Sequence, residues 1–302
     1  MQFGKNVHLP LYDKHHYIGL TPHVHRGLWF DKFCSCWRFA VPQDKKQKKD
    51  HKRSGKNNKS QKPAVTGKPY LHVNKSQWLN HVATIPTSDS FSDVQQRTKR
   101  LVESLGGKME TYQTTSRFVT GIGLSNPVEN GMVWHHILGE PYLPGSSVKG
   151  IVRAWALEQM EELALKEKIE AEEIFLRIFG SAPKQEPEGE AQQTGSMIFF
   201  DALPEGAVEL EADIMTPHFS PYYDNPNQNK AVEWYDPIPI PFLTVAAGQT
   251  FCFAFAPRPG YQNDNAHADV RHVSAWLKDA LIEIGAGAKT AVGYGRFKRK
   301  WK

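Results

Sequence analysis

The sequence contains few cysteines and no long hydrophobic run. Three cysteines in 302 residues, an odd number, cannot supply the framework of a disulfide-stapled protein, so a reducing compartment is the simplest interpretation. Without a run of about 18 apolar residues, no membrane-spanning helix is expected. The N-terminal stretch MQFGKNVHLPLYDKHH has no apolar core segment, so we expect no secretory signal. Together these absences predict a cytoplasmic protein.

Apolar residues are nevertheless plentiful enough for a folded core. The chain is 40% hydrophobic, 11% aromatic and 23% charged, which excludes a wholly disordered protein. Its length suggests two domains or one elaborated domain. The 20 prolines predict many turns and irregular loops.

Positive charge is concentrated in one tract rather than spread over the chain. Residues 43–62 hold nine Lys or Arg against two Asp, whereas the whole chain has a net charge of only +5. Because this tract has no apolar residue, residues 43–69 are predicted to form a basic, disordered insertion. Two interpretations stay open, a solvated loop that keeps the protein soluble and a flexible arm attracted to a polyanion. A second basic cluster closes the chain, at Arg296, Lys298, Arg299, Lys300 and Lys302.

The spacing of apolar residues predicts both helices and strands. Helices are expected over residues 93–105, 146–163, 171–179 and 269–284. Short strands are expected over residues 116–122, 131–137, 196–201, 208–214, 238–245 and 250–256. The order of strand, helix, strands, helix and strand is typical of an α+β, ferredoxin-like fold. We expect residues 1–42 to be irregular and to pack on the core, and 70–302 to form the main domain, with loop-rich insertions at 181–195 and 215–237.

The glycine-rich segment GAGAKTAVGYGRF, residues 285–297, is the first candidate binding site. It lacks the spacing of a P-loop and of a dinucleotide fingerprint, and it follows a helix rather than a strand, so no nucleotide cofactor is expected. Glycines without Cβ atoms let a phosphate chain approach the backbone, and cations and a ring are interleaved. A turn required only for packing is the alternative. The candidate RNA-binding residues are Gly285, Gly287, Lys289, Thr290, Gly293, Tyr294, Gly295 and Arg296.

The turn GSSVKG, residues 145–150, is the second candidate binding site. Ser146 or Ser147 is expected to cap the following helix. The free N–H groups and partial positive charge of a helix N-terminus attract an anion such as phosphate. An ordinary capped helix is the alternative. The candidate RNA-binding residues here are Gly145, Ser146, Ser147, Lys149, Gly150 and Arg153.

These two segments, PYLPGSSVKGIVRAWA and GAGAKTAVGYGRF, resemble the signature segments of the RAMP superfamily of CRISPR-associated proteins. Three further segments, IFGS, MIFFDALP and DIMTPHFSPYY, look like those of the subunit-six family of the type III-B Cmr effector complex. The resemblance covers about residues 116–298. The basic insertion at 44–62 departs from the family pattern.

The resemblance implies an RNA-recognition-like RAMP fold whose helix turn and glycine-rich loop hold guide RNA. It implies a non-catalytic subunit of a ribonucleoprotein for antiviral defence, because target cleavage in this family is attributed to the backbone subunits. The implied partners are the 3′ region of the CRISPR guide RNA, the target RNA, and the backbone subunit, small subunit and subunit one of the Cmr complex.

Two other chemistries stay open. Some RAMP relatives cut precursor RNA with a histidine general base, which would make the chain a metal-independent endoribonuclease. The histidines available for this are His15, His16, His135 and His136, together with His218 near Asp201, Asp213 and Asp224. Asp201 follows an apolar strand and equally suits a cap or a turn. Weak zinc-ligand candidates are His23, His25, Cys34 and Cys36, which lack the usual ligand spacing. The aromatic loop 215–237 is also compatible with a protein interface.

Overall fold

The computed structural model describes most of the chain outside the basic insertion. The described residues are 25–32, 34, 37–40, 70–85, 91–181, 193–219, 222–223, 225–232, 234–261 and 265–300. The predicted insertion at 43–69 and most of the loop at 181–195 lie outside them. Within the described part, no helix has the length and apolarity needed to cross a membrane.

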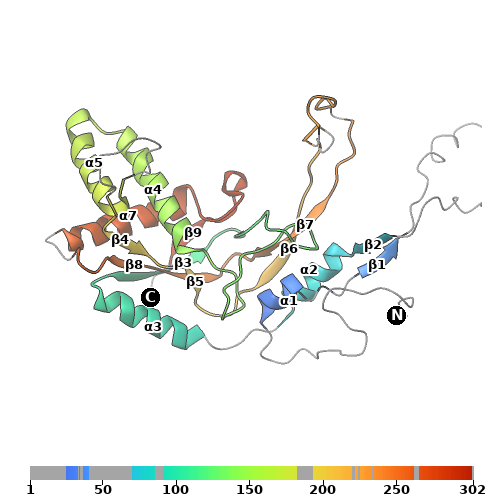
Figure 1. Cartoon of the computed structure of the whole chain (residues 1–302), viewed down its shortest axis with the longest axis horizontal. Coiled ribbons are helices and arrows are strands. Elements are labelled where there is room, and N and C mark those ends of the chain that lie inside the picture. The colour runs from blue at the N-terminus through green and yellow to red at the C-terminus, as the bar shows by residue number, and fades with distance from the viewer. Residues whose placement is uncertain are drawn as a thin grey trace, which may run out of the picture.

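A five-stranded antiparallel sheet forms the centre of the fold (Figure 1). Its main path runs β4 (Met197–Phe199), β8 (Thr250–Pro257), β3 (Lys108–Thr114) and β9 (Phe297–Arg299), and β5 (Leu203–Pro204) also pairs with β8. Helix α4 (Gly145–Glu161) lies between β3 and β4 in the chain, and α7 (Ala266–Glu283) lies between β8 and β9. Two split βαβ units in this strand order are the ferredoxin-like arrangement, so the predicted fold class is confirmed.

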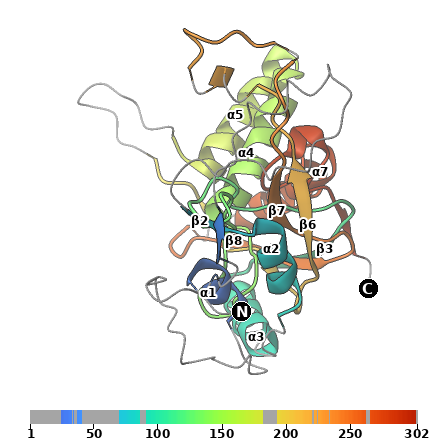
Figure 2. The same cartoon turned by 90° about the vertical axis from the view of Figure 1, so that its right-hand side faces the viewer.

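Helices cover both faces of this sheet. Helices α4 and α7 lie on one face, and α5 (Leu165–Phe179) packs on α4, whereas α3 (Phe91–Ser104) lies on the other face (Figures 1 and 2). Predicted and observed helices agree closely, because amphipathic spacing reports the buried face directly. The exception is α5, which begins six residues before the predicted 171 because its first turns are exposed.

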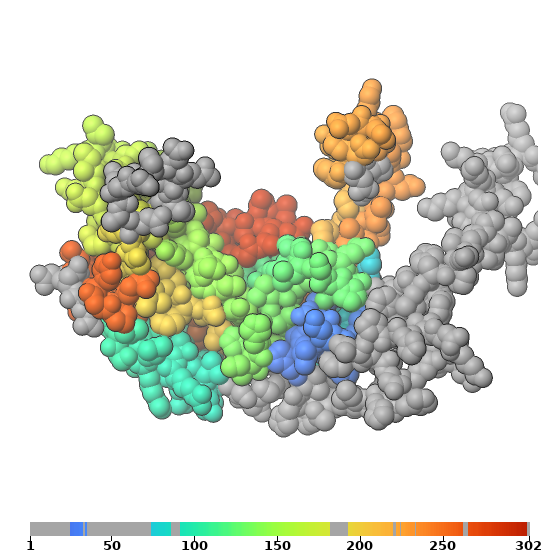
Figure 3. Space-filling model, viewed as in Figure 1, coloured from blue at the N-terminus to red at the C-terminus, as the bar shows by residue number. Residues whose placement is uncertain are grey.

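Two smaller sheets of two strands each are separate from the central sheet. Strands β6 (Leu210–Met215) and β7 (Ile240–Val245) pair, and they carry the predicted aromatic loop as a projecting arm (Figure 3). Strands β1 (Trp37–Ala40) and β2 (Tyr70–Val73) also pair, with Ala40 opposite Tyr70. Short helices α1 (Arg26–Lys32) and α2 (Lys75–Ala83) precede and follow this second small sheet.

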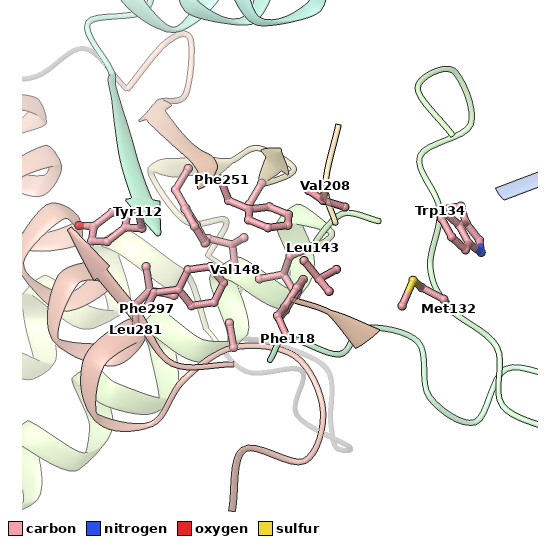
Figure 4. Close-up of a cluster of buried hydrophobic side chains, with 14 of the residues drawn as sticks. Tyr112, Phe118, Met132, Trp134, Leu143, Val148, Val208, Phe251, Leu281 and Phe297 are labelled. Carbon is pink, nitrogen blue, oxygen red and sulfur yellow. The ribbon is translucent and has the colours of Figure 1, made fainter. Parts of the chain in front are cut away.

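Aromatic rings fill the core between the sheet and the helices. The Phe118 ring lies 5.4 Å from that of Phe251 and 5.6 Å from that of Phe297, centroid to centroid, with edge-to-face geometry. Figure 4 shows these rings beside Val148 of α4 and Leu281 of α7. This cluster holds the starts of α4 and of β9 in fixed positions on the sheet.

Two predicted strands are wrong. Residues 116–122 and 131–137 are irregular, and each makes only an isolated bridge, Phe118 with Val245 and Trp134 with Pro141. Phe118, Val119, Met132 and Trp134 are buried because the segments cross the core as loops, whereas Ile137 is 72% exposed. Gly121, with φ of 74°, turns the first segment out of an extended path.

Candidate nucleic-acid interface

The glycine-rich segment turns repeatedly between α7 and β9. Its glycines have positive φ values of 75°, 85°, 94° and 70° at Gly285, Gly287, Gly293 and Gly295. Only glycine adopts these positive φ values without steric cost. The backbone path of the segment therefore explains why glycine occupies these positions. Lys289 is also left-handed, with φ of 60°, at the start of the short 3-10 helix Thr290–Val292.

Internal packing explains most of these glycines. A Cβ atom on Gly287 would collide with the carbonyl oxygen of Val119, and one on Gly295 with that of Ala286. A Cβ atom on Gly285 would lie 2.7 Å from Nη1 of Arg296. Only Gly293 of the four has open space where a Cβ would be. The packing alternative from the sequence therefore holds at three of the four glycines.

Backbone hydrogen bonds leave only the outer turn of the segment for a ligand. Gly295 donates its N–H to the carbonyl of Arg117 at 2.7 Å, and Ala288 donates to that of Val119 at 2.8 Å. The N–H groups of Ala286, Val292, Gly293, Tyr294 and Arg296 are likewise used inside the chain. The half-exposed turn at Lys289 and Thr290 remains as the predicted contact surface.

Two cations of this segment have no acidic partner among the described residues. Lys289 places Nζ 5.6 Å from the ring centroid of Phe242 and 6.0 Å from that of Tyr294. The guanidinium of Arg296 lies beside Gly285, and its buried Nη1 has no hydrogen-bond partner in the described part of the chain. An anion such as phosphate would satisfy the half-exposed ammonium of Lys289.

Neighbouring polar groups are, in contrast, already paired. Arg117 binds Glu211 at 2.6 Å and Asp213 at 2.9 Å. Tyr294 donates its hydroxyl to Asp213 at 2.6 Å, and burial together with this bond raises the pKa of Tyr294 to about 12. The Tyr294 hydroxyl is therefore occupied, and its ring flanks Lys289.

The start of α4 differs from the predicted cap. Pro144 is the N-cap residue and makes no side-chain cap, while Ser146 and Ser147 lie exposed inside the first turn. The N–H of Gly145 donates instead to Oδ1 of Asp201 at 2.7 Å. The anion at this helix N-terminus is thus a carboxylate of the chain itself, which replaces the predicted serine cap.

The remaining predicted residues of α4 are partly engaged. Lys149 donates Nζ to the carbonyl of Phe179 at 2.9 Å, and burial, with Arg258 and Arg153 nearby, lowers the pKa of Lys149. The guanidinium carbon of Arg153 lies 5.1 Å from the ring centroid of Phe175. Neither cation has a carboxylate partner in the described residues, and Gly150 is exposed beside them.

Removing the Asp201 carboxylate should destabilise the start of α4. Asp201→Ala leaves the Gly145 N–H without its acceptor, at an expected cost of about 1–2 kcal/mol in the free energy of unfolding. Urea unfolding followed by tryptophan fluorescence measures it. Asp201→Asn keeps an acceptor oxygen and should lose less. Equal stability of the wild type and Asp201→Ala would show that this cap is dispensable.

The two predicted segments lie at opposite edges of the sheet. Gly145 packs against the carbonyl of Phe199 in β4, whereas Gly295 and Arg296 lead into β9. Three strand spacings separate β4 from β9, which is about 14 Å. The outline of the molecule is hollowed between the α4–α5 end and the β6–β7 arm, and the C-terminal segment lies at its floor (Figure 3).

Three of the histidines considered as general bases, His135, His136 and His218, lie within the described residues. Nδ1 of His135 accepts hydrogen bonds from the N–H groups of Ile137 and Leu138, and burial lowers the pKa of His135. Its acceptor nitrogen is therefore not available as a general base. His136 and His218 are exposed, and the nearby Asp213 is bound by Arg117 and Tyr294. The other histidine and aspartate candidates, His15, His16 and Asp224, lie outside the described residues.

His25 is unsuitable as a zinc ligand. Its Nδ1 accepts the N–H of Leu28 at 2.9 Å, and its Nε2 lies 2.8 Å from the carbonyl of His136, so both nitrogens are used. Cys34 is buried, whereas His23 and Cys36 lie outside the described residues. Within the described part of the chain, no three potential ligands form a metal site.

Three features of the site have no local sequence signal. Phe242 supplies a ring to Lys289 from β7, Ser116 accepts the N–H of Arg296, and Asp201 caps α4 from 56 residues away. Each pairing depends on the tertiary fold. Covariation between these positions would be the signal able to reveal them.

Comparisons with known proteins agree on one superfamily. The RAMP superfamily model matches residues 111–298. The Cmr6 subunit of the Pyrococcus furiosus CRISPR system is 32% identical, over 65% of this chain and 69% of that protein. The Cmr6 subunit of Saccharolobus solfataricus is 26% identical, over 66% of this chain and 61% of that protein.

One solved structure supports the fold independently. It is a cryo-EM structure of the type III-B Cmr-beta complex bound to cognate target RNA. A chain of that complex has a TM-score of 0.55 and 24% identity, over 75% of the present chain and 71% of that chain. At this identity, the likeness establishes the architecture of the chain.

Proposed function

Because the chain belongs to the RAMP superfamily and, within it, to the Cmr6 family, we propose that it is a subunit of a type III-B CRISPR ribonucleoprotein. In that particle it contacts the 3′ region of the guide RNA without catalysing a reaction. Target RNA pairs with the guide nearby, and the backbone subunit, the small subunit and subunit one are the neighbouring proteins.

The observation that carries RNA contact is that no described acidic residue pairs with the predicted cations. Lys149, Arg153, Lys289 and Arg296 make carbonyl or ring contacts, or none, whereas nearby Arg117 is held by two carboxylates. Cations left without carboxylates favour an external polyanion, because phosphate replaces water around them without breaking an ion pair.

The spacing of the two segments suits a single strand. The exposed hydroxyls of Ser146 and Ser147 and the Gly150 backbone face solvent at one edge of the sheet, and the Lys289 turn does so at the other. A single strand of RNA that crosses the sheet from one edge to the other covers about 14 Å. At a stacked spacing of ~3.4 Å per nucleotide, this is about four nucleotides. The chain therefore holds backbone phosphates and leaves sequence recognition to base pairing.

Isolation of the native particle tests this function. A tagged chain is purified from its host, and the eluate is analysed by mass spectrometry and RNA sequencing. We expect other Cmr subunits and guide RNA derived from CRISPR repeats. A chain recovered alone, or with unprocessed repeat RNA, would contradict the proposal and favour RNA cleavage by a histidine.

A further inference from the structure

Helix α5 carries, next to its buried face, a stripe of exposed apolar residues. Its inner face buries Phe175, Ile178 and Phe179. Leu165, Ile169 and Leu176 are 78%, 54% and 44% exposed. At about 100° per residue, their spacing of four and seven places them within about 40° of one another on the helix. Single exposed apolar residues are common, but an aligned set on one helix marks a contact surface.

Negative charge is in excess over α5 and the end of α4. Residues 158–176 contain seven Glu and two Lys, a net charge of −5, and all seven glutamates are exposed. They are Glu158, Glu161, Glu162, Glu167, Glu170, Glu172 and Glu173. We call the exposed apolar stripe and these glutamates the α5 ridge. The ridge lies at the end of the molecule away from the β6–β7 arm (Figures 1 and 3).

The charge of the α5 ridge excludes several occupants. RNA phosphates are repelled by a surface with a net charge of −5. A second copy would bring two acidic ridges together, which like-charge repulsion opposes. The basic tract 43–62 of the chain has the complementary charge but contains no apolar residue, so it cannot cover the leucines and isoleucine.

We infer that the α5 ridge is the docking surface for a neighbouring protein that presents apolar side chains within a rim of Lys and Arg. The apolar stripe supplies the buried centre of the contact, and the glutamates pair with the partner's basic rim. The inference rests on the proposed function, because it places the chain in a particle with several proteins. It orients the chain, with the ridge toward protein and the Lys289 turn toward RNA.

A photo-crosslinker on the ridge tests the inference in the assembled particle. Leu165 is replaced by benzoyl-phenylalanine in the tagged chain, the particle is isolated from the host and irradiated, and the joined peptides are identified. We expect a crosslink to another subunit, in a segment that contains apolar residues flanked by Lys or Arg. A crosslink to RNA, to a second copy or to residues 43–62, or no crosslink, would overturn the inference. The same substitution at Leu101, 50% exposed on α3, is the matched control.

A double variant separates this inference from the proposed function. Leu165→Ser with Ile169→Ser should reduce the recovery of the crosslinked subunit at least tenfold and leave guide RNA bound. Leu101→Ser should leave both unchanged. Full recovery of that subunit with the double variant overturns only the docking surface. If the wild-type chain carries neither RNA nor another subunit, the proposed function fails together with it.

Discussion

Replacing Lys289 and Arg296 by glutamine should weaken RNA binding about a hundredfold. Neither cation has a carboxylate partner among the described residues, and both side chains are half-exposed, so a phosphate can approach each of them. Loss of a charge-assisted contact costs about tenfold in affinity. The slope of log K against log salt concentration should also become less steep by about 1.4, because each of the two lost phosphate contacts contributes ~0.7 for a single strand. Fluorescence anisotropy with a labelled guide, at several salt concentrations, measures both quantities.

The control is a pair of arginines on the other face of the sheet. Arg97 and Arg100 lie exposed on α3, across the sheet from α4 and α7 (Figure 2). Arg97→Gln with Arg100→Gln removes the same charge and should change affinity less than twofold. If both double variants lose affinity equally, net charge rather than a site governs binding. An unchanged affinity after loss of Lys289 and Arg296 would place the RNA elsewhere.

Replacing Arg26 by methionine should cause the largest loss of stability, about 3–5 kcal/mol. Arg26 is 5% exposed and binds the carbonyls of Ile85 and Val208, each at 3.0 Å. It also pairs at 3.4 Å with Glu140, which is fully buried. The substitution leaves a buried carboxylate without its cation and two carbonyls without donors. Urea unfolding of the purified chain measures the change.

A compensating substitution identifies the buried charge as the cause. Adding Glu140→Gln to Arg26→Met removes the buried negative charge and should restore part of the lost stability. The Gln side chain keeps an oxygen that can accept the N–H of Val208, which Glu140 Oε2 accepts at 3.1 Å. If the double variant is less stable than Arg26→Met alone, the stability lost in Arg26→Met comes from the packing of the guanidinium and not from the buried charge.

The helices and the fold class could be predicted because their signals are local. The buried residues of α7, Val273, Leu277 and Leu281, repeat at helical spacing, and Gly285 follows the end of the helix. Strand β3 and helix α2 were not predicted. The β3 sequence KMETYQT alternates buried with more exposed residues, but it contains too many polar residues to be recognised as a central strand.

The candidate site was predictable in location and only partly in mechanism. Glycines mark the turn between α7 and β9, but most are needed because Val119 and Ala286 approach them, and these contacts exist only in the folded chain. The serines were expected to cap α4, whereas Asp201 provides the acceptor from a distant strand end. The local sequence indicates that another part of the chain packs closely against these positions. Which residues do so depends on the tertiary fold.

Crosslinking of RNA to the native particle tests the central claim most directly. The isolated particle is irradiated with ultraviolet light and digested, and peptides that carry a nucleotide are identified by mass spectrometry. The account predicts adducts on this chain in the peptides that contain residues 145–153 and 285–296. Adducts confined to the α5 ridge or to residues 43–62, with both predicted peptides unmodified, would contradict it.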